Sequence, residues 1–295
     1  MTLRGIFYTP ADSLRAPWRL AAFLVLFFAA DWAFSSLAHS VRRPQSFVGG
    51  FLFSFSIVLA AVAAAQYVML RLVEKRPWSD IGLGAAQAAP KLLGFGLALG
   101  GLGILLPSLA LLGAHWLRPS DTAPGSGSTV LFALQVAALM LPQSLAEELL
   151  SRGYGFAAIR EGAGPVTAVA VTSAIFGGLH LANPGVSAES LASVVLAGVF
   201  LGVLVIVTGS VYAAWMAHFA WNFVIVGVLH AKVSGITFPT PGWRLIENGP
   251  VWVTGGAWGP EGGAAACVGM LGVITALAYW RRAPAAAAVA EIANG

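Results

Sequence analysis

The sequence predicts an all-α fold, a polytopic membrane helical bundle with about eight transmembrane helices, from three observations. First, 58% of the 295 residues are hydrophobic and only 9% are charged, whereas a soluble domain has roughly a quarter charged residues. Second, apolar stretches reach the roughly 20 residues that a helix needs to cross a hydrocarbon layer of ~30 Å. Third, Arg and Lys fall in the short segments between these stretches, a pattern of membrane topology. We therefore expect the lipid bilayer as a partner and no nucleic acid.

Eight apolar runs are suited to spanning helices, and Gly and Pro interrupt the chain without dividing it. The runs lie at about Trp18 to Leu37, Phe47 to Leu72, Leu92 to Leu117, Val130 to Leu150, Val166 to Leu181, Leu191 to Thr208, Val211 to Leu229 and Ala264 to Trp280. Residues 1–295 are thus expected to form a single membrane-embedded domain. The lone cysteine, Cys267, excludes a disulfide framework and a thiolate metal cluster.

The basic residues predict that both termini are cytoplasmic. With the N-terminus inside, 11 Arg and Lys residues fall on the cytoplasmic side and 5 on the other, and short cytoplasmic segments are the ones enriched in these residues. The five outside are Arg42, Arg43, Arg118, Lys232 and Arg244. The longest polar segment, about 231–263, carries Trp243, Trp252 and Trp258, so we expect an extracytoplasmic loop that rests on the membrane interface.

An ionisable residue inside a membrane span costs several kcal/mol of free energy unless it is paired or hydrated, so each one indicates a structural or functional role. Glu148 and Arg152 lie four residues apart on one helix face, in the order that favours a structural ion pair. This pairing leaves Glu147 without a local partner and free to face a different cavity. We expect the chain to turn at Arg160, which would bring Glu147 level with His180, because about 20 Å and about 22 Å of helix separate them from that turn.

His218 and Asn222 project from one side of the seventh span, again four residues apart. A single intramembrane His usually bonds to a neighbouring helix. Two His, one Asn and one Glu at membrane depth together favour an active site, which we assign to Glu147, His180, His218 and Asn222. Asp31 in the first span has no identifiable partner in the sequence, and we leave it out of the site.

Three motifs then resemble one family. The runs EELLSR at 147–152, FGGLH at 176–180 and HFAWN at 218–222 occur in the order typical of the CAAX protease and bacteriocin-processing family. This resemblance covers residues 141–229 and implies a catalytic core at about 129–230, with Glu148, Arg152 and Phe176 as structural support. It further implies an intramembrane glutamic endopeptidase in a bacterial plasma membrane that acts on a peptide or membrane-protein substrate.

The chemistry that the resemblance implies also fits the residues themselves. Glu147 in an apolar surround suits a general base that takes a proton from water, and His180 would share that water. His218 and Asn222 could donate hydrogen bonds to the oxyanion of the tetrahedral intermediate. This mechanism requires no cofactor.

Two alternatives stay open. Glu147, His180 and His218 could instead bind zinc, since two His and one Glu form a known catalytic set, although the HExxH signature is absent. Intramembrane Glu and His also occur in proton relays, so the chain could be a proton-coupled transporter or a non-catalytic membrane scaffold. No oligomeric state is predicted.

Overall fold

The computed structural model describes residues 3–9, 14–38, 40, 44–121 and 127–281. Each of the eight predicted apolar runs contains a helix. These helices are α2 (Ala16–Ala38), α3 (Phe47–Tyr67), α4 (Pro90–Gly113), α5 (Thr129–Arg152), α6 (Tyr154–Leu179), α7 (Ala188–Thr208), α8 (Val211–Phe223) and α10 (Ala264–Trp280). Arg42, Arg43 and Arg282, which entered the topology prediction, lie outside the described residues.

Six stretches of the described chain are long and apolar enough to cross a membrane. One of them, Thr129–Leu179, contains both α5 and α6 in 51 residues, and α10 is a shorter apolar helix of 17 residues. The predicted all-α polytopic bundle is confirmed. The number of spans depends on whether α5 and α6 are counted separately and whether α10 is included.

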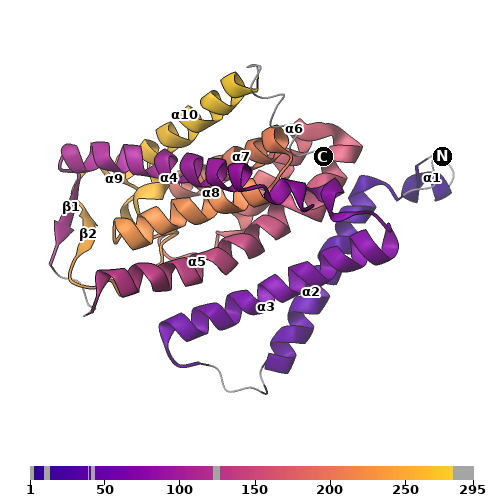
Figure 1. Ribbon diagram of the computed structural model, residues 1–295, viewed down its shortest axis with the longest axis horizontal. Coiled ribbons are helices and arrows are strands. Elements are labelled where there is room, and N and C mark those ends of the chain that lie inside the picture. The colour runs from indigo at the N-terminus through magenta and orange to yellow at the C-terminus, as the bar shows by residue number, and fades with distance from the viewer. Residues whose placement is uncertain (1–2, 10–13, 39, 41–43, 122–126, 282–295) are drawn as a thin grey trace.

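Helix α8 occupies the centre of the bundle, where it packs against α4, α5 and α7 (Figure 1). Gly96 and Gly100 make this contact close, since a Cβ atom at these positions would lie 2.1 Å from the Ala213 carbonyl oxygen and 1.9 Å from the Ala217 carbonyl oxygen. Glycine therefore allows α4 to approach the backbone of α8 directly, and this contact positions the helix that carries His218.

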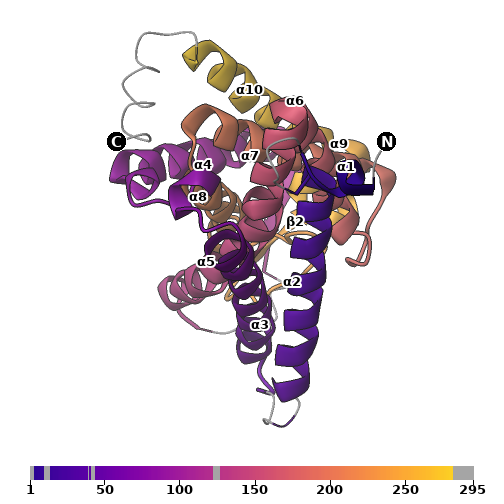
Figure 2. The ribbon, with the colours of Figure 1, turned by 90° about the vertical axis from the view of Figure 1, so that its right-hand side faces the viewer.

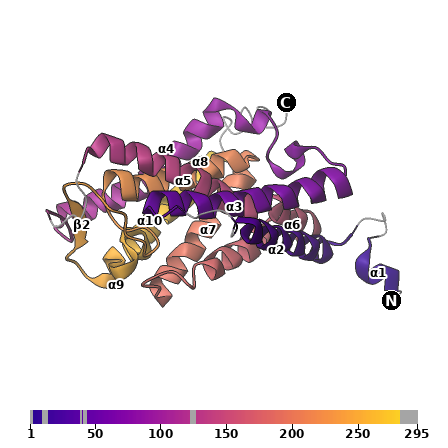
Figure 3. The same cartoon turned by 90° about the horizontal axis from the view of Figure 1, so that it is seen from below.

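Helices α2 and α3 form a pair on one side of the bundle. Figure 2 shows them beneath the other helices, and Figure 3 shows them across the near face when the molecule is seen from below. Helix α3 packs on α5 and α2 packs on α6. The pair therefore covers the face of α5 that carries Glu147.

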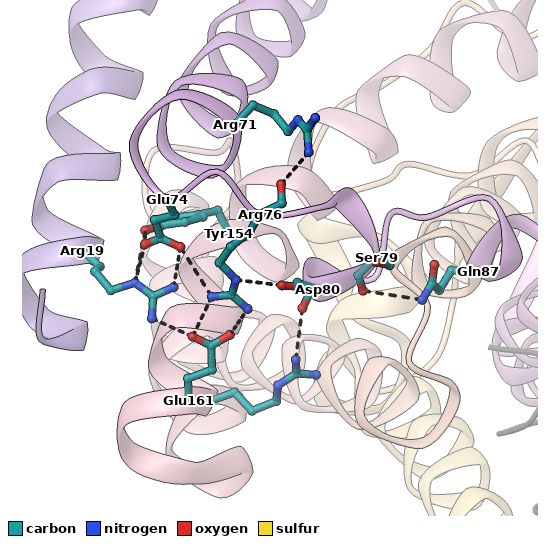
Figure 4. A network of polar contacts seen from close by, with 10 residues as sticks. Arg19, Arg71, Glu74, Arg76, Ser79, Asp80, Gln87, Tyr154 and Glu161 are labelled. Atoms are coloured by element: carbon teal, nitrogen blue, oxygen red, sulfur yellow. Dashed lines mark hydrogen bonds and ion pairs between the residues drawn. The ribbon is translucent and has the colours of Figure 1, made fainter. Parts of the chain in front are cut away.

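The end of the α2–α3 pair is fastened by a polar cluster, drawn in Figure 4. Arg19 donates to Glu74 at 2.7 Å and to Glu161 at 2.7 Å, and Arg76 pairs with Glu161 at 2.7 Å and with Asp80 at 2.8 Å. These residues lie on α2, on α6 and in the segment between α3 and α4, so the cluster joins three parts of the chain. The Tyr154 hydroxyl also donates to Glu74.

The predicted turn at Arg160 is wrong. Residues 154–163 are helical, and the direction of the chain changes at Gly153 and at Gly164, which has φ +87°. Pro165 has no backbone N–H, which favours a break at that point. A Cβ atom at Gly153 would lie 2.3 Å from Oε1 of Gln66, so glycine there allows α3 to reach the junction between α5 and α6.

The segment 231–263 is more structured than an interfacial loop. Its strand β2 (Arg244–Glu247) pairs antiparallel with β1 (Leu117–Ser120), a small sheet that the hydropathy pattern did not predict. It continues through the short helix α9 (Val251–Thr254). Trp252 is exposed, but Trp258 is fully buried, so the segment folds partly into the protein and the expectation of a loop resting wholly on the interface is wrong.

Candidate active site

The last turns of α5 carry two adjacent carboxylates, Glu147 and Glu148, and the two lie in different surroundings. Glu148 is fully buried, and its Oε1 accepts from Nη1 of Arg152 at 3.3 Å and from Nδ1 of His218 at 2.9 Å. The predicted Glu148/Arg152 pair is therefore confirmed. The same carboxylate also orients the imidazole of His218, a contact that spacing within α5 could not show.

Arg152 has further partners in the bundle. Its Nη2 donates to the Gly198 carbonyl at 2.9 Å, and its guanidinium lies 4.6 Å from the ring centroid of Phe176. The Phe176 ring also meets the His180 ring at 4.8 Å and the His218 ring edge-on at 5.9 Å. Phe176 thus contacts both imidazoles and packs against the buried guanidinium.

Glu147 has a local partner, so the expectation that it would have none is wrong. Gln143, one helical turn earlier, donates its side-chain amide to Oε1 of Glu147, and Asn222 donates to Oε1 of Gln143 at 3.1 Å. Oε2 of Glu147 lies 3.8 Å from Nε2 of His218 and makes no hydrogen bond within the described part of the protein. One oxygen of Glu147 is therefore held in place and the other is free.

His180 ends α6, and its Nδ1 lies 2.7 Å from the Phe176 carbonyl oxygen. A carbonyl oxygen can only accept, so Nδ1 carries the proton, and in the singly protonated ring Nε2 is the acceptor. Nδ1 of His218 faces a carboxylate in the same manner, which leaves its Nε2 on the side of Glu147.

One cavity of about 400 Å³ is lined by all four predicted site residues, Glu147, His180, His218 and Asn222. They come from α5, the end of α6, and α8, three elements that are separate in the sequence. Residues of α2, of α3 and of the segment 233–238 also line it. The packing of these helices thus gathers a carboxylate, two imidazoles and an amide around one space.

Sequence reasoning missed three residues of this region. Gln143 joins Asn222 to Glu147, and Asp31 lines the cavity from α2. Glu261, from the segment 231–263, accepts from Nε1 of Trp221 at 3.0 Å and from the backbone N–H of Ser234 at 2.6 Å. Gln143 could have been found from its spacing of four from Glu147, whereas Glu261 belongs to a loop whose path the sequence does not reveal.

The fold and the site define a class: a polytopic helical membrane protein whose central helices gather acid, imidazole and amide groups around an internal cavity. Residues 129–224 of the chain match the model of the family described as Type II CAAX prenyl endopeptidase Rce1-like. This match confirms the family resemblance carried by the three motifs, all of which it contains. Comparisons with curated proteins and with solved structures found no match.

The zinc alternative was tested against the geometry. Nδ1 of each imidazole contacts a carbonyl or carboxylate oxygen, as the second ring nitrogen of a metal-binding His usually does. Among the described residues, however, no three His, Cys, Asp or Glu side chains are grouped so that they could hold one metal ion. Glu147, His180 and His218 are therefore not grouped as the ligands of one ion in this arrangement.

Proposed function

We propose that the chain is an intramembrane endopeptidase that hydrolyses a peptide bond with water activated by Glu147 and His180. The observation that supports this proposal is the convergence of Glu147, His180, His218 and Asn222 on one cavity, within the segment that matches a CAAX endopeptidase family. The substrate is a peptide or a membrane protein.

Glu147 is the proposed general base. Its free Oε2 can accept a proton from water, while the hydrogen bond from Gln143 fixes the orientation of the carboxylate. The free Nε2 of His180 can accept a second hydrogen bond from the same water. The attacking oxygen then adds to the carbonyl carbon of the substrate. The tetrahedral intermediate collapses with cleavage of the C–N bond as the proton on Glu147 passes to the leaving amine.

Asn222 and His218 are the proposed donors to the oxyanion. A side-chain amide has two N–H groups, so Asn222 can keep its bond to Gln143 and direct the second N–H at the substrate. His218 would donate from Nε2 when both ring nitrogens are protonated, with Glu148 holding the Nδ1 side. Each such donor contributes about 3 to 4 kcal/mol in other hydrolases.

The decisive variant is Glu147→Gln, which keeps the shape and removes the proton acceptor. Cleavage of a peptide library by the purified full-length protein should fall at least about 100-fold, with no change in thermal stability. His180→Ala should do the same, and His218→Ala and Asn222→Ala should each slow turnover by about 100- to 1,000-fold. Glu189→Gln, which removes an exposed carboxylate at the start of α7, is the matched control and should leave the rate unchanged.

Two outcomes would redirect the proposal. If a strong chelator silenced the unmodified protein and added zinc restored it, the metal-dependent form of the same protease would be correct. If Glu147→Gln retained full activity in a clean preparation, both mechanisms would fail, and the transporter or scaffold would become the better hypothesis.

A further inference from the structure

The cavity of the candidate active site extends to the α2–α3 pair, where its wall is mainly aromatic. Helix α2 contributes Phe27, Phe28 and Asp31, and helix α3 contributes Phe51 and Phe55. Phe27 and Asp31 are four residues apart, as are Phe51 and Phe55, so each pair projects from one face of its helix. The single acidic residue of α2 therefore lies within a group of phenylalanine rings.

Two carboxylates, Asp31 and Glu147, line this cavity, and the imidazoles of His180 and His218 line it as well, but no Lys or Arg does. Glu147 is bonded to Gln143 and faces His218. Asp31 makes no hydrogen bond or ion pair within the described residues, which makes it the free carboxylate of the cavity. An unpaired carboxylate in a cavity attracts groups of the opposite charge.

We propose that Asp31 and the phenylalanines around it form a subsite for a positively charged side chain, Lys or Arg, of the substrate. This inference rests on the proposed function and adds a feature of the substrate to it. Asp31 is a specificity-determining residue here and takes no part in the hydrolysis.

The chemistry of the subsite suits a cation in three ways. An ammonium or guanidinium group makes charge-assisted hydrogen bonds to a carboxylate, stronger than those of neutral donors. The faces of Phe rings attract a cation. The methylene stem of Lys or Arg can pack against the same rings. A neutral apolar group would bury the rings equally well but would leave Asp31 unpaired at membrane depth, which is costly.

The test measures binding without turnover. In the Glu147→Gln background, purified full-length protein in detergent is titrated with two short, end-blocked Ala/Leu peptides that differ only in one residue, Lys or norleucine. The position of that residue is moved along the peptide in a series. At one position the Lys peptide should bind about 10- to 100-fold more tightly than its norleucine counterpart.

Adding Asp31→Asn should remove this preference and leave the affinity for the norleucine peptide unchanged, whereas Asp31→Glu should keep part of it. Glu189→Gln, a neutralised exposed carboxylate outside the cavity, should keep all of it. If Asp31→Asn fails to fold, the double variant Phe51→Leu/Phe55→Leu must reduce the preference instead.

Equal binding of the Lys and norleucine peptides at every position would overturn the inference, and so would a folded Asp31→Asn variant that keeps the preference. Neither result depends on cleavage. Failure of the proposed function appears separately, as the absence of peptide hydrolysis by the unmodified protein.

Discussion

Arg152 is a fully buried guanidinium that contacts three elements of the bundle. It pairs with Glu148 on its own helix, donates to Gly198 on α7, and lies over the ring of Phe176 on α6. Glu148 in turn holds Nδ1 of His218. The ion pair therefore does more than neutralise charge, because its carboxylate also orients the imidazole of His218 in the candidate site.

Replacing Arg152 with Ala should destabilise the protein by about 3 to 5 kcal/mol, because Glu148 would be left as an uncompensated buried charge. Thermal unfolding in detergent measures this loss. Arg71→Ala is a suitable control, because Arg71 is exposed and its guanidinium binds only the nearby Arg76 carbonyl among the contacts described. A fully stable but inactive Arg152→Ala variant would show that Arg152 acts in the reaction itself.

Glu247 on strand β2 introduces a pH dependence outside the membrane spans. Burial raises the pKa of Glu247 to about 7, and the nearby Lys232 only partly opposes this effect. The folded protein thus binds a proton that the unfolded chain releases between about pH 4.5 and 7. Stability should therefore fall as the pH rises through this window and level off above it.

Glu247→Gln should remove that decline. At pH 8 the variant should be more stable than the unmodified protein by about 1 to 2 kcal/mol, a value reduced for solvent screening of a partly exposed group. Near pH 4 the two proteins should unfold at similar temperatures. An identical pH profile for both proteins would contradict the raised pKa.

Helices α4 and α8 approach each other through glycine, and this contact determines where His218 and Asn222 lie. A single methyl group at Gly100 would clash with the Ala217 carbonyl, the residue immediately before His218. At Gly94, also on α4, a Cβ atom would meet nothing within 4 Å. The two positions therefore form a matched pair for substitution.

Gly100→Ala should destabilise the protein by about 1 to 3 kcal/mol, the usual cost of overpacking, and should also lower peptidase activity by displacing α8. Gly94→Ala should be neutral or slightly stabilising, because Ala is the better helix former. Thermal unfolding and peptide cleavage measured side by side would check both. If Gly100→Ala behaved like Gly94→Ala, α8 would have to tolerate movement away from α4.

At the scale of the whole molecule, the helix α1 (Leu3–Phe7) and the β1–β2 sheet lie at opposite ends of the long axis (Figure 1). The polar cluster around Arg19 and Glu161 (Figure 4) includes the first turn of α2, where Trp18 donates to the Ile6 carbonyl of α1. Together with the bias in Arg and Lys, this arrangement agrees with a cytoplasmic α1 end and an extracytoplasmic sheet, which we keep as a prediction.

A reporter that is active only outside the cytoplasm should give no signal when it is fused after Gly295. The same reporter inserted after Gly242, an exposed glycine with φ +73° before β2, should give a strong signal. The reverse pattern would overturn the orientation of the whole bundle.

The sequence by itself determined the membrane class, the apolar runs in which the spanning helices lie and the four proposed site residues, which line one cavity. Hydropathy and residue spacing are local properties, so they do not depend on the tertiary packing. The spacing of four between Glu148 and Arg152, and between His218 and Asn222, is of this kind. Gly96 and Gly100 have the spacing of four that allows a close helix approach, but the structure identifies α8 as the partner.

Only the tertiary structure decided which groups meet across helices. The bond from His218 to Glu148 and the link from Asn222 through Gln143 to Glu147 join α8 to α5, and Asp31 reaches the cavity only because α2 packs beside α6. Trp258 and Glu261 are buried by the path of a Gly- and Pro-rich segment that has no hydrophobic period to read. Such contacts depend on how each helix is rotated and how deep it lies relative to its neighbours. The spacing of residues and the hydropathy of the sequence do not encode either quantity.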